Sequence, residues 1–234
     1  MSHPDHTSAV CPLVLDQVQI LKRDEHGVFC PLFPPLERSI TPGEILTVMG
    51  PSGCGKSTLL NWISGWLKPE FKTSGDIRLG DCSLQKLAPE KRNLGLLLQD
   101  PLLFPHMTVG QNLAFGIPQS TKSRTERKDR VRAALAEAGL EGFENRHPDT
   151  LSGGQKARVA LMRTLLSKPK ALLLDEPFSK LDENLRDRVR HFVFEHARSE
   201  SLPTLLVTHD QADAALASRY NSSPETAIVH LTPP

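Results

Sequence analysis

Residues Gly50 to Thr58, with the sequence GPSGCGKST, have the types and spacing that phosphate binding requires. The glycines let backbone N–H groups turn inward around phosphate oxygens. Lys56 supplies a positive charge for the β- and γ-phosphates, Ser57 offers a hydroxyl to Mg²⁺, and Thr58 is placed to contact the α-phosphate. The segment fits the pattern G-x-x-x-x-G-K-[ST], so we predict a nucleotide phosphate loop. Its binding residues are Gly50, Pro51, Ser52, Gly53, Cys54, Gly55, Lys56, Ser57 and Thr58.

An acidic pair ends the leucine-rich segment LLLDE, which runs from Leu172 to Glu176. A buried strand here would deliver Asp175 beside the phosphates, where its carboxylate can hold Mg²⁺ through water. Glu176 follows directly and would polarise an attacking water as a general base. Acidic pairs after strands are common in ordinary turns, so this interpretation depends on the phosphate loop. Together the two segments predict nucleotide hydrolysis.

A second glycine-rich segment, LSGGQ, occupies Leu151 to Gln155. Ser152 is a good helix N-cap, and Gly153, Gly154 and Gln155 would open the helix that follows. A helix N-terminus attracts anions, so this signature loop is a second candidate phosphate contact. Taken alone, however, a segment of this kind is more often a simple capped turn.

Apolar runs and helical patterns provide the elements that would position these residues. We predict buried strands at 44–50, 94–100, 171–177 and 204–210, each ending in polar residues, and helices at 56–67, 124–140 and 155–167. Strands that alternate with helices indicate a parallel α/β sheet, whose ligands gather at the carboxyl ends of the strands. After Tyr220 there is room for one strand at most, in the segment AIVHL.

The composition excludes several other classes of protein. With 38% hydrophobic and 24% charged residues among 234, the chain has ordinary values for a globular domain. The net charge of +1 argues against nucleic acid as the main partner. The four cysteines lack metal-ligand spacing and favour a reducing compartment. We expect no secretion signal at the start and no membrane span, because no apolar run approaches about 20 residues.

The order of the motifs carries a family resemblance. Five features follow one another in the chain: LSGGQ, an amphipathic helix, LLLDEP, SKLD and THD. In this order they resemble the motifs of the ATP-binding-cassette (ABC) ATPases, and the resemblance extends over Leu13 to Asp213. The resemblance implies an α/β fold: a P-loop NTPase core with a RecA-like parallel sheet, an N-terminal antiparallel β subdomain and a helical subdomain carrying the signature loop. Residues 1–234 would form one domain, with the core at 10–100 and 168–234 and the helical subdomain at 101–167.

The resemblance also implies how ATP and Mg²⁺ are bound. Two chains of a homodimer would meet head to tail, each ATP lying between the phosphate loop of one chain and the signature loop of the other. Gln99 would touch Mg²⁺ and water, Asp182 in SKLD would span the dimer, and His209 in THD would contact the γ-phosphate. The implied catalytic residues are Glu176, His209, Lys56 and Gln99; the implied metal ligands are Ser57, Gln99 and Asp175; Ser152, Gly153, Gly154, Gln155 and Asp182 complete the nucleotide contacts.

Residues Gln99 to Gly116, QDPLLFPHMTVGQNLAFG, resemble the stretch found in bacterial importer ATPases for polyamines, iron, thiamine, sulfate or sugars. In those proteins it forms a groove for a coupling helix of the membrane permease. The implied partners are integral membrane permease subunits and a separate substrate-binding protein, with no nucleic acid. The implied location is cytoplasmic, peripheral on the inner face of the cell membrane.

Two alternatives and three departures from the family pattern remain open. The alternatives are a non-transport ABC-type ATPase acting as a regulatory switch and an ABC exporter subunit.

Phe29 lies at about the distance from Lys56 expected of an adenine-stacking ring, but its surroundings fit the pattern poorly. The tail after His209 lacks the usual family ending, and we expect no regulatory domain of the kind that some importer ATPases carry. At Cys54, where many members have serine or alanine, we expect a thiol that a maleimide can reach.

Overall fold

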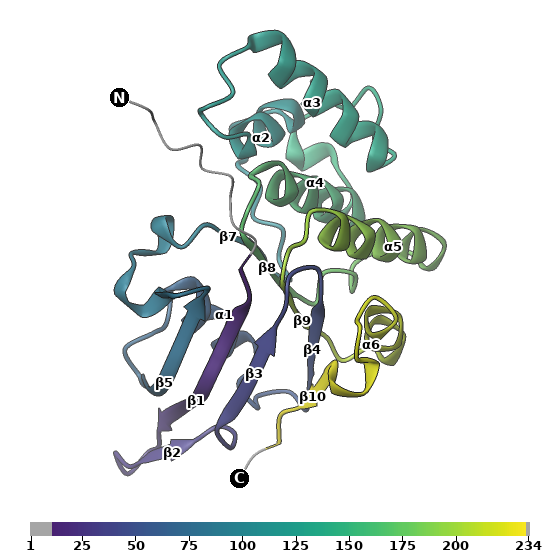
Figure 1. The fold of residues 1–234 in the computed structure, drawn as a ribbon. Helices are drawn as coiled ribbons and strands as arrows, with labels where there is room; N and C mark the ends of the chain where they lie inside the picture. The colour runs from purple at the N-terminus through teal and green to yellow at the C-terminus, as the bar shows by residue number, and fades with distance from the viewer. Residues whose placement is uncertain (1–10, 233–234) are drawn as a thin grey trace, which may run out of the picture.

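Residues 11–232 are described by the computed structural model, apart from the side chain of Asn184, and they form two sheets with helices around them (Figure 1). One sheet is antiparallel and contains the N-terminal strands, and the other is parallel. This arrangement confirms the α/β fold class. The start of the chain, where we expect no secretion signal, lies outside the described residues.

The parallel sheet has the strand order β10-β4-β9-β8-β7. Its strands are β4 (Ile45–Met49), β7 (Leu94–Leu97), β8 (Ala171–Asp175), β9 (Thr204–Val207) and β10 (Ile228–His230). Every residue of β4, β8 and β9 is buried, as expected of parallel strands that helices or a second sheet cover on both faces. The predicted strands are confirmed, but each ends earlier than its apolar segment, because the polar residues at its end form the following loop.

The antiparallel sheet is built on one long strand, β1, which pairs with β2, β3 and β5. The pairing of β1 with β5 shifts register between Asp16 and Gln19. At the same place Gly75 of β5 has φ 89°, and a Cβ there would lie 2.3 Å from the carbonyl oxygen of Gln17. Only glycine fits this close approach. The strands are β1 (Leu13–Arg23), β2 (Phe29–Pro31), β3 (Leu36–Ile40), β5 (Phe71–Leu79) and β6 (Cys82–Ser83).

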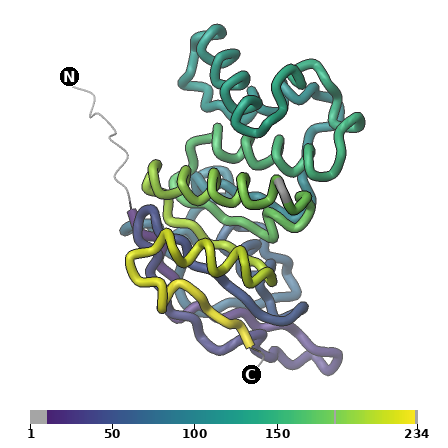
Figure 2. The backbone as a smooth tube through the Cα atoms, turned by 90° about the vertical axis from the view of Figure 1, so that its right-hand side faces the viewer, coloured from purple at the N-terminus to yellow at the C-terminus, as the bar shows by residue number. Residues whose placement is uncertain are grey.

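The helices fall into groups around the parallel sheet. In Figures 1 and 2, α2, α3 and α4 stack at the top of the molecule, and α5 and α6 lie below them along one side. Within residues 11–232, no helix combines the length and the apolarity needed to cross a membrane. The helices are α1 (Lys56–Ser64), α2 (Val109–Gly116), α3 (Arg124–Glu137), α4 (Gly153–Leu166), α5 (Glu183–Ser199) and α6 (Gln211–Ser218); short 3₁₀ turns lie at Leu84–Lys86, Pro89–Lys91, Pro148–Thr150 and Pro224–Thr226.

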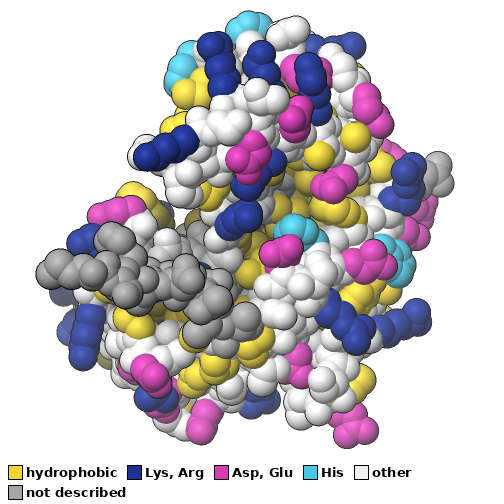
Figure 3. Space-filling model, turned by 45° about the horizontal axis from the view of Figure 1, so that its top comes forward, with side chains coloured by type: hydrophobic (Ala, Val, Ile, Leu, Met, Phe, Trp, Pro, Cys, Tyr) yellow, Lys and Arg dark blue, Asp and Glu magenta, His cyan; other side chains and the backbone are white. Residues whose placement is uncertain are grey.

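Alternation along the parallel strands divides the hydrophobic core into two parts. On β8, Leu173 packs with α1 and the antiparallel sheet, whereas Leu172 and Leu174 pack with α4 and α5. The first part therefore fixes the start of α1 against β8, and the second fixes the upper helices against the same strand. The face of the molecule seen in Figure 3 carries interspersed acidic and basic side chains, with apolar side chains exposed between the upper helices and the rest.

Candidate functional site

The carboxyl edge of the parallel sheet brings the predicted phosphate loop, acidic pair and histidine together. Gly50 follows β4, Asp175 ends β8, and His209 and Gln99 come shortly after β9 and β7. These four strands are consecutive neighbours in the sheet and run in the same direction. Their following loops therefore lie side by side, as expected for a ligand site in a parallel sheet.

Two glycines of the phosphate loop have left-handed backbone conformations, in which any other residue would be strained. Gly53 and Gly55 have φ of 84° and 97°, and Gly55 is the N-cap of α1. Lys56 begins α1, and its Nζ donates to the carbonyl oxygens of Gly50 (2.7 Å) and Pro51 (2.8 Å). The ammonium group is thus held over the loop beside the helix N-terminus, where both would attract a phosphate. Among the other residues of the loop, Pro51, Ser52, Gly53 and Ser57 are exposed.

Cys54 lies inside this loop but is buried. Its side chain is 3% exposed, and its Sγ lies 4.0 Å from Nζ of Lys56. The thiol fills space beneath the loop, and a Cβ at Gly50 would come within 2.8 Å of it. The expectation that a maleimide can reach this thiol is therefore wrong for this conformation.

Glu176 is held between an amide and an imidazole. Its Oε2 accepts a hydrogen bond from Nε2 of Gln99 at 3.0 Å, and its Oε1 lies 3.0 Å from Nδ1 of His209. The Glu176 backbone has φ 46°, a left-handed conformation that costs a residue other than glycine about 1–3 kcal/mol. The Glu176 N–H is fixed by the carbonyl oxygen of Val207 on β9 at 2.9 Å. A carboxylate oriented in this way can accept a proton from a water molecule.

Asp175 ends β8 directly before Glu176 and is 7% exposed. Burial raises the pKa of the Asp175 carboxyl, and the charge of Glu176 raises it further. A hydrogen bond from the Ser57 hydroxyl and the charge of Lys56 act in the opposite direction. The hydroxyl and the carboxylate are adjacent oxygen ligands of the kind that Mg²⁺ prefers, so this pair fits the implied metal.

The signature loop forms a capping box at the start of α4. The hydroxyl of Ser152 accepts from the Gln155 N–H at 3.3 Å, and Oε1 of Gln155 accepts from the Ser152 N–H at 2.9 Å. Apart from its chain neighbours and the backbone of its own helix, a Cβ at Gly153 would meet no atom within 4 Å, so this helix N-terminus is open to an incoming group. Within the described part of the chain, no hydrogen bond or ion pair joins this loop to the phosphate loop.

Asp182 caps the next helix. Its Oδ1 accepts a hydrogen bond from the Leu185 N–H at 3.0 Å at the start of α5, and the residue is exposed. The preceding residues lie against the signature loop, since a Cβ at Gly154 would come within 3.2 Å of the Lys180 carbonyl oxygen. Asp182 and the signature loop therefore belong to one surface.

A buried charge network behind His209 was not predicted from the sequence. Arg190 on α5 forms an ion pair with Asp213, and its Nη2 lies 2.7 Å from Oδ2 of Asp210. Asp213 in turn accepts from the Thr208 hydroxyl at 2.7 Å. The network fixes the loop on both sides of His209. The position of Arg190 on the inward face of an amphipathic helix could have indicated a buried ion pair. Its partners Asp210 and Asp213 could not be identified, because they lie about twenty residues further along the chain.

Phe29, whose distance from Lys56 suits an adenine-stacking ring but whose surroundings fit the family pattern poorly, lies on β2 and is half-buried. The Nζ of Lys72 lies 4.1 Å from the centre of this ring, which is a cation–π contact. Stacking of a base on that face of Phe29 would require Lys72 to move. The chain's only tyrosine, Tyr220, instead packs edge-on against Phe194, with a ring-centre distance of 5.6 Å.

Comparisons with known sequences identify the family of this chain. A sequence profile of the family described as "ABC transporter" matches residues 34–179. The chain is 49% identical over 175 residues to the uncharacterized ABC transporter ATP-binding protein YnjD of Escherichia coli K12, covering 75% of this chain and 80% of that protein. It is 43% identical over 180 residues to the Fe(3+) ions import ATP-binding protein FbpC of Escherichia coli O157:H7, covering 77% and 51%. It is also 43% identical over 183 residues to the spermidine/putrescine import ATP-binding protein PotA of Bacillus cereus, covering 78% and 55%. The chain thus spans about half the length of these two import proteins.

Solved structures show the same fold. The dimeric ATP-binding cassette MJ0796 bound to ADP and Pi superposes with a TM-score of 0.77 and 27% identity, covering 94% of each chain. A second dimeric structure of MJ0796, a bacterial ABC transporter cassette, has a TM-score of 0.78 with the same identity and coverage. With the family profile and the similarity to YnjD, these matches show that the chain belongs to the ABC transporter family, as an ATP-binding subunit that hydrolyses ATP.

Proposed function

We propose that this ATPase drives import through a membrane permease, binding Mg-ATP at shared sites of a head-to-tail homodimer. The observation that carries the proposal is the position of Glu176, held between Gln99 and His209 at the edge of the sheet where the phosphate loop lies. ATP hydrolysis needs a general base, polar groups that orient this base, and a loop that binds the phosphates. A separate substrate-binding protein would deliver the cargo.

Each group has a distinct role in this proposal. Lys56 and the N–H groups of the phosphate loop neutralise the phosphates, and Glu176 takes a proton from the attacking water. His209 and Gln99 hold the Glu176 carboxylate and line the position of the γ-phosphate. Since a loose phosphoryl-transfer transition state gives the protein little covalent chemistry to perform, catalysis consists mainly of positioning and charge stabilisation.

Mg²⁺ would be held by Ser57, Asp175 and Gln99, where it would neutralise charge on the β- and γ-phosphates. We expect Asp175→Asn to remove the effect of Mg²⁺ on ATP binding and to lower ATP hydrolysis by at least about 100-fold. Calorimetric titration with ATP, with and without Mg²⁺, measures the first effect, and phosphate release measures the second. Asp129→Asn, on the exposed side of α3, is the matched control. Equal Mg²⁺ dependence in Asp175→Asn and the wild type would remove Asp175 from the metal site.

The segment that follows Gln99 offers an apolar surface for the permease. Leu102 and Phe115 are 64% and 62% exposed, although both are large apolar side chains. The Phe104 ring packs edge-on against Phe115, with a centre-to-centre distance of 4.7 Å. Buried Asn112 fixes this segment by accepting from the Phe104 N–H at 2.8 Å and donating to the Phe104 carbonyl at 3.1 Å. A rigid, exposed apolar surface beside Gln99 favours a transport partner over a regulatory switch.

This surface belongs to the proposed helical subdomain at 101–167, so binding of the permease there would be coupled through Gln99 to the nucleotide site. The import proteins FbpC and PotA, which are similar to this chain, favour import over export. We infer that the chain works on the cytoplasmic side of the membrane, held there by the permease.

We expect Phe115→Glu to prevent co-purification with the permease while changing the ATPase activity of the isolated chain less than twofold. A charge in an apolar contact is costly, whereas the exposed Phe115 side chain does not contact the nucleotide site. Trp66→Glu is the matched control, because Trp66 is 68% exposed and lies after α1, outside residues 101–167. Normal co-purification of Phe115→Glu would contradict docking at this surface.

A further inference from the structure

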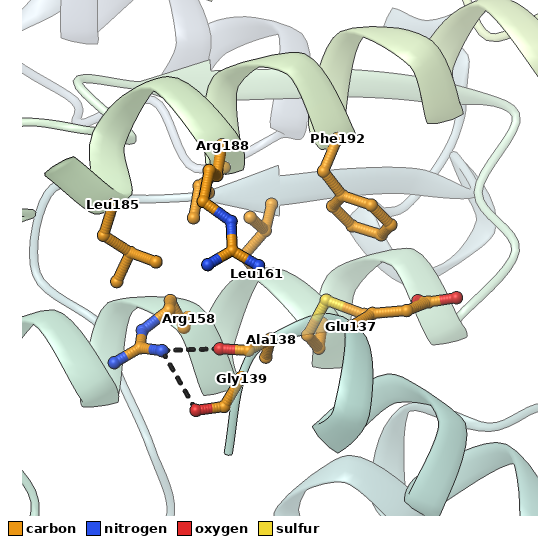
Figure 4. Close-up of a pocket in the computed structure, with 10 residues that line it drawn as sticks. Glu137, Ala138, Gly139, Arg158, Leu161, Leu185, Arg188 and Phe192 are labelled. Atoms are coloured by element: carbon orange, nitrogen blue, oxygen red, sulfur yellow. Dashed lines mark hydrogen bonds between the residues drawn. The ribbon is translucent and has the colours of Figure 1, made fainter. Parts of the chain in front are cut away.

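A partly enclosed cavity of about 210 Å³ lies away from the nucleotide site, between the end of α3, the middle of α4 and the first half of α5 (Figure 4). Its polar side chains are Arg158 on α4, Arg188 on α5 and Glu137 at the end of α3. Leu161, Leu185 and Phe192 are among its apolar walls. None of these residues has a role in the ATPase function proposed above.

The two arginines approach the cavity from opposite walls. Arg158 donates through Nη1 to the carbonyl oxygens of Ala138 (2.5 Å) and Gly139 (3.4 Å), but its Nε is buried without a hydrogen-bond partner. Within residues 11–232, Arg188 takes part in no ion pair at 4.0 Å or less. Figure 4 shows the Arg188 guanidinium reaching from α5 toward α4, on the side where Arg158 lies.

The charges in the cavity are not balanced locally. Glu137 pairs with neither arginine in the described part of the chain, and in Figure 4 its carboxylate lies at the other end of the cavity. Burial lowers the pKa of Arg158, and the charge of Asp182 raises it again. Two guanidinium groups thus share the cavity with one lining acidic side chain, Glu137, and this leaves a local excess of positive charge that a bound anion would neutralise.

We propose that this cavity binds a small amphipathic carboxylate. The carboxylate would bridge Arg158 and Arg188, because a guanidinium group presents paired donors that match the two carboxylate oxygens. The alkyl chain would lie along Leu161, Leu185 and Phe192, since small-molecule sites are mostly apolar with a few polar groups that fix orientation. The cavity volume of about 210 Å³ lies below the roughly 300–1,000 Å³ typical of sites for drug-sized ligands, which favours a small ligand such as hexanoate.

The test is calorimetric titration of the full chain with hexanoate in saturating ADP, so that the phosphate loop is occupied. We expect Arg188→Gln to weaken hexanoate binding by at least about tenfold, the usual effect of losing a charge-assisted hydrogen bond. Arg198→Gln is the matched control, since Arg198 is exposed on the same helix and does not line the cavity. It should bind hexanoate as the wild type does, and hexylamine, which carries the opposite charge, should not bind.

Three results would overturn the proposal: no binding of hexanoate to the wild-type chain, equal binding by Arg188→Gln, or equal binding of hexylamine. Circular dichroism and ADP affinity should be unchanged in Arg188→Gln, which separates loss of the site from loss of the fold. Because ADP binding is measured in the same samples, failure of this proposal leaves the ATPase assignment intact.

Discussion

Replacing Glu176 with glutamine is expected to lower ATP hydrolysis by at least about 100-fold while leaving ATP binding intact, because general bases typically contribute 10²–10⁴-fold. The amide has the shape of the carboxylate and can keep a hydrogen bond to Gln99, but it cannot accept the proton of the attacking water. The Lys56 ammonium and the phosphate loop are unchanged, so the affinity for ATP should be preserved.

The measurements are phosphate release, ATP titration and size-exclusion chromatography of Glu176→Gln with ATP. Because hydrolysis no longer reopens the proposed dimer, we expect ATP to hold a stable dimer that ADP does not. Glu195→Gln is the control, since Glu195 is exposed on α5, outside the site. If Glu176→Gln turned over ATP at close to the wild-type rate, Glu176 could not be the base.

Local patterns were sufficient to predict the strands and loops that build the nucleotide site. The buried runs that became β4, β8 and β9 are short, apolar and followed by polar residues, and each pattern lies within a single segment. Parallel strands of one sheet end at the same edge, which placed the polar residues after them together, whereas the roles of Gln99 and His209 came from the resemblance to the ABC ATPases. The structure brings the side chains of Gln99, Glu176 and His209 into hydrogen-bond contact.

Features that depend on distant residues were not predicted. The contact of Arg190 with Asp213 joins α5 to α6, and no spacing within either helix reveals it. The burial of Cys54 results from packing of the phosphate loop against the rest of the core, whereas the sequence indicated only a helix N-terminus and a nearby lysine. The register shift of β1 opposite Gly75 likewise depends on residues about sixty positions apart in the chain.

Within residues 11–232, no hydrogen bond or ion pair joins the signature loop to the phosphate loop of the same chain. We propose that the two loops meet across a dimer. Lys56→Ala should disable the phosphate loop, and Ser152→Arg should obstruct the open helix N-terminus of the signature loop. Each variant alone should be nearly inactive, because both sites of its homodimer contain one damaged loop.

Mixing the two variants is expected to restore ATP hydrolysis. One site of the heterodimer then joins both damaged loops, while the other joins the intact phosphate loop of the Ser152→Arg chain to the intact signature loop of the Lys56→Ala chain. With random pairing in a two-fold dimer, an equal mixture should recover up to about a quarter of wild-type activity. If each chain instead built its site from its own two loops, every site in the mixture would be damaged and nothing would return.

Crosslinking provides an independent measurement, because the two sites of a dimer can depend on each other for hydrolysis even when one is intact. Cysteines at Ser52 in one chain and Ser152 in another, with the exposed Cys30 and Cys82 replaced by serine, should form an ATP-dependent disulfide between chains. The same pair placed in one chain should give few intramolecular links, since the two loops would then meet only across the interface. Absence of both the restored activity and the crosslink between chains would contradict the shared sites.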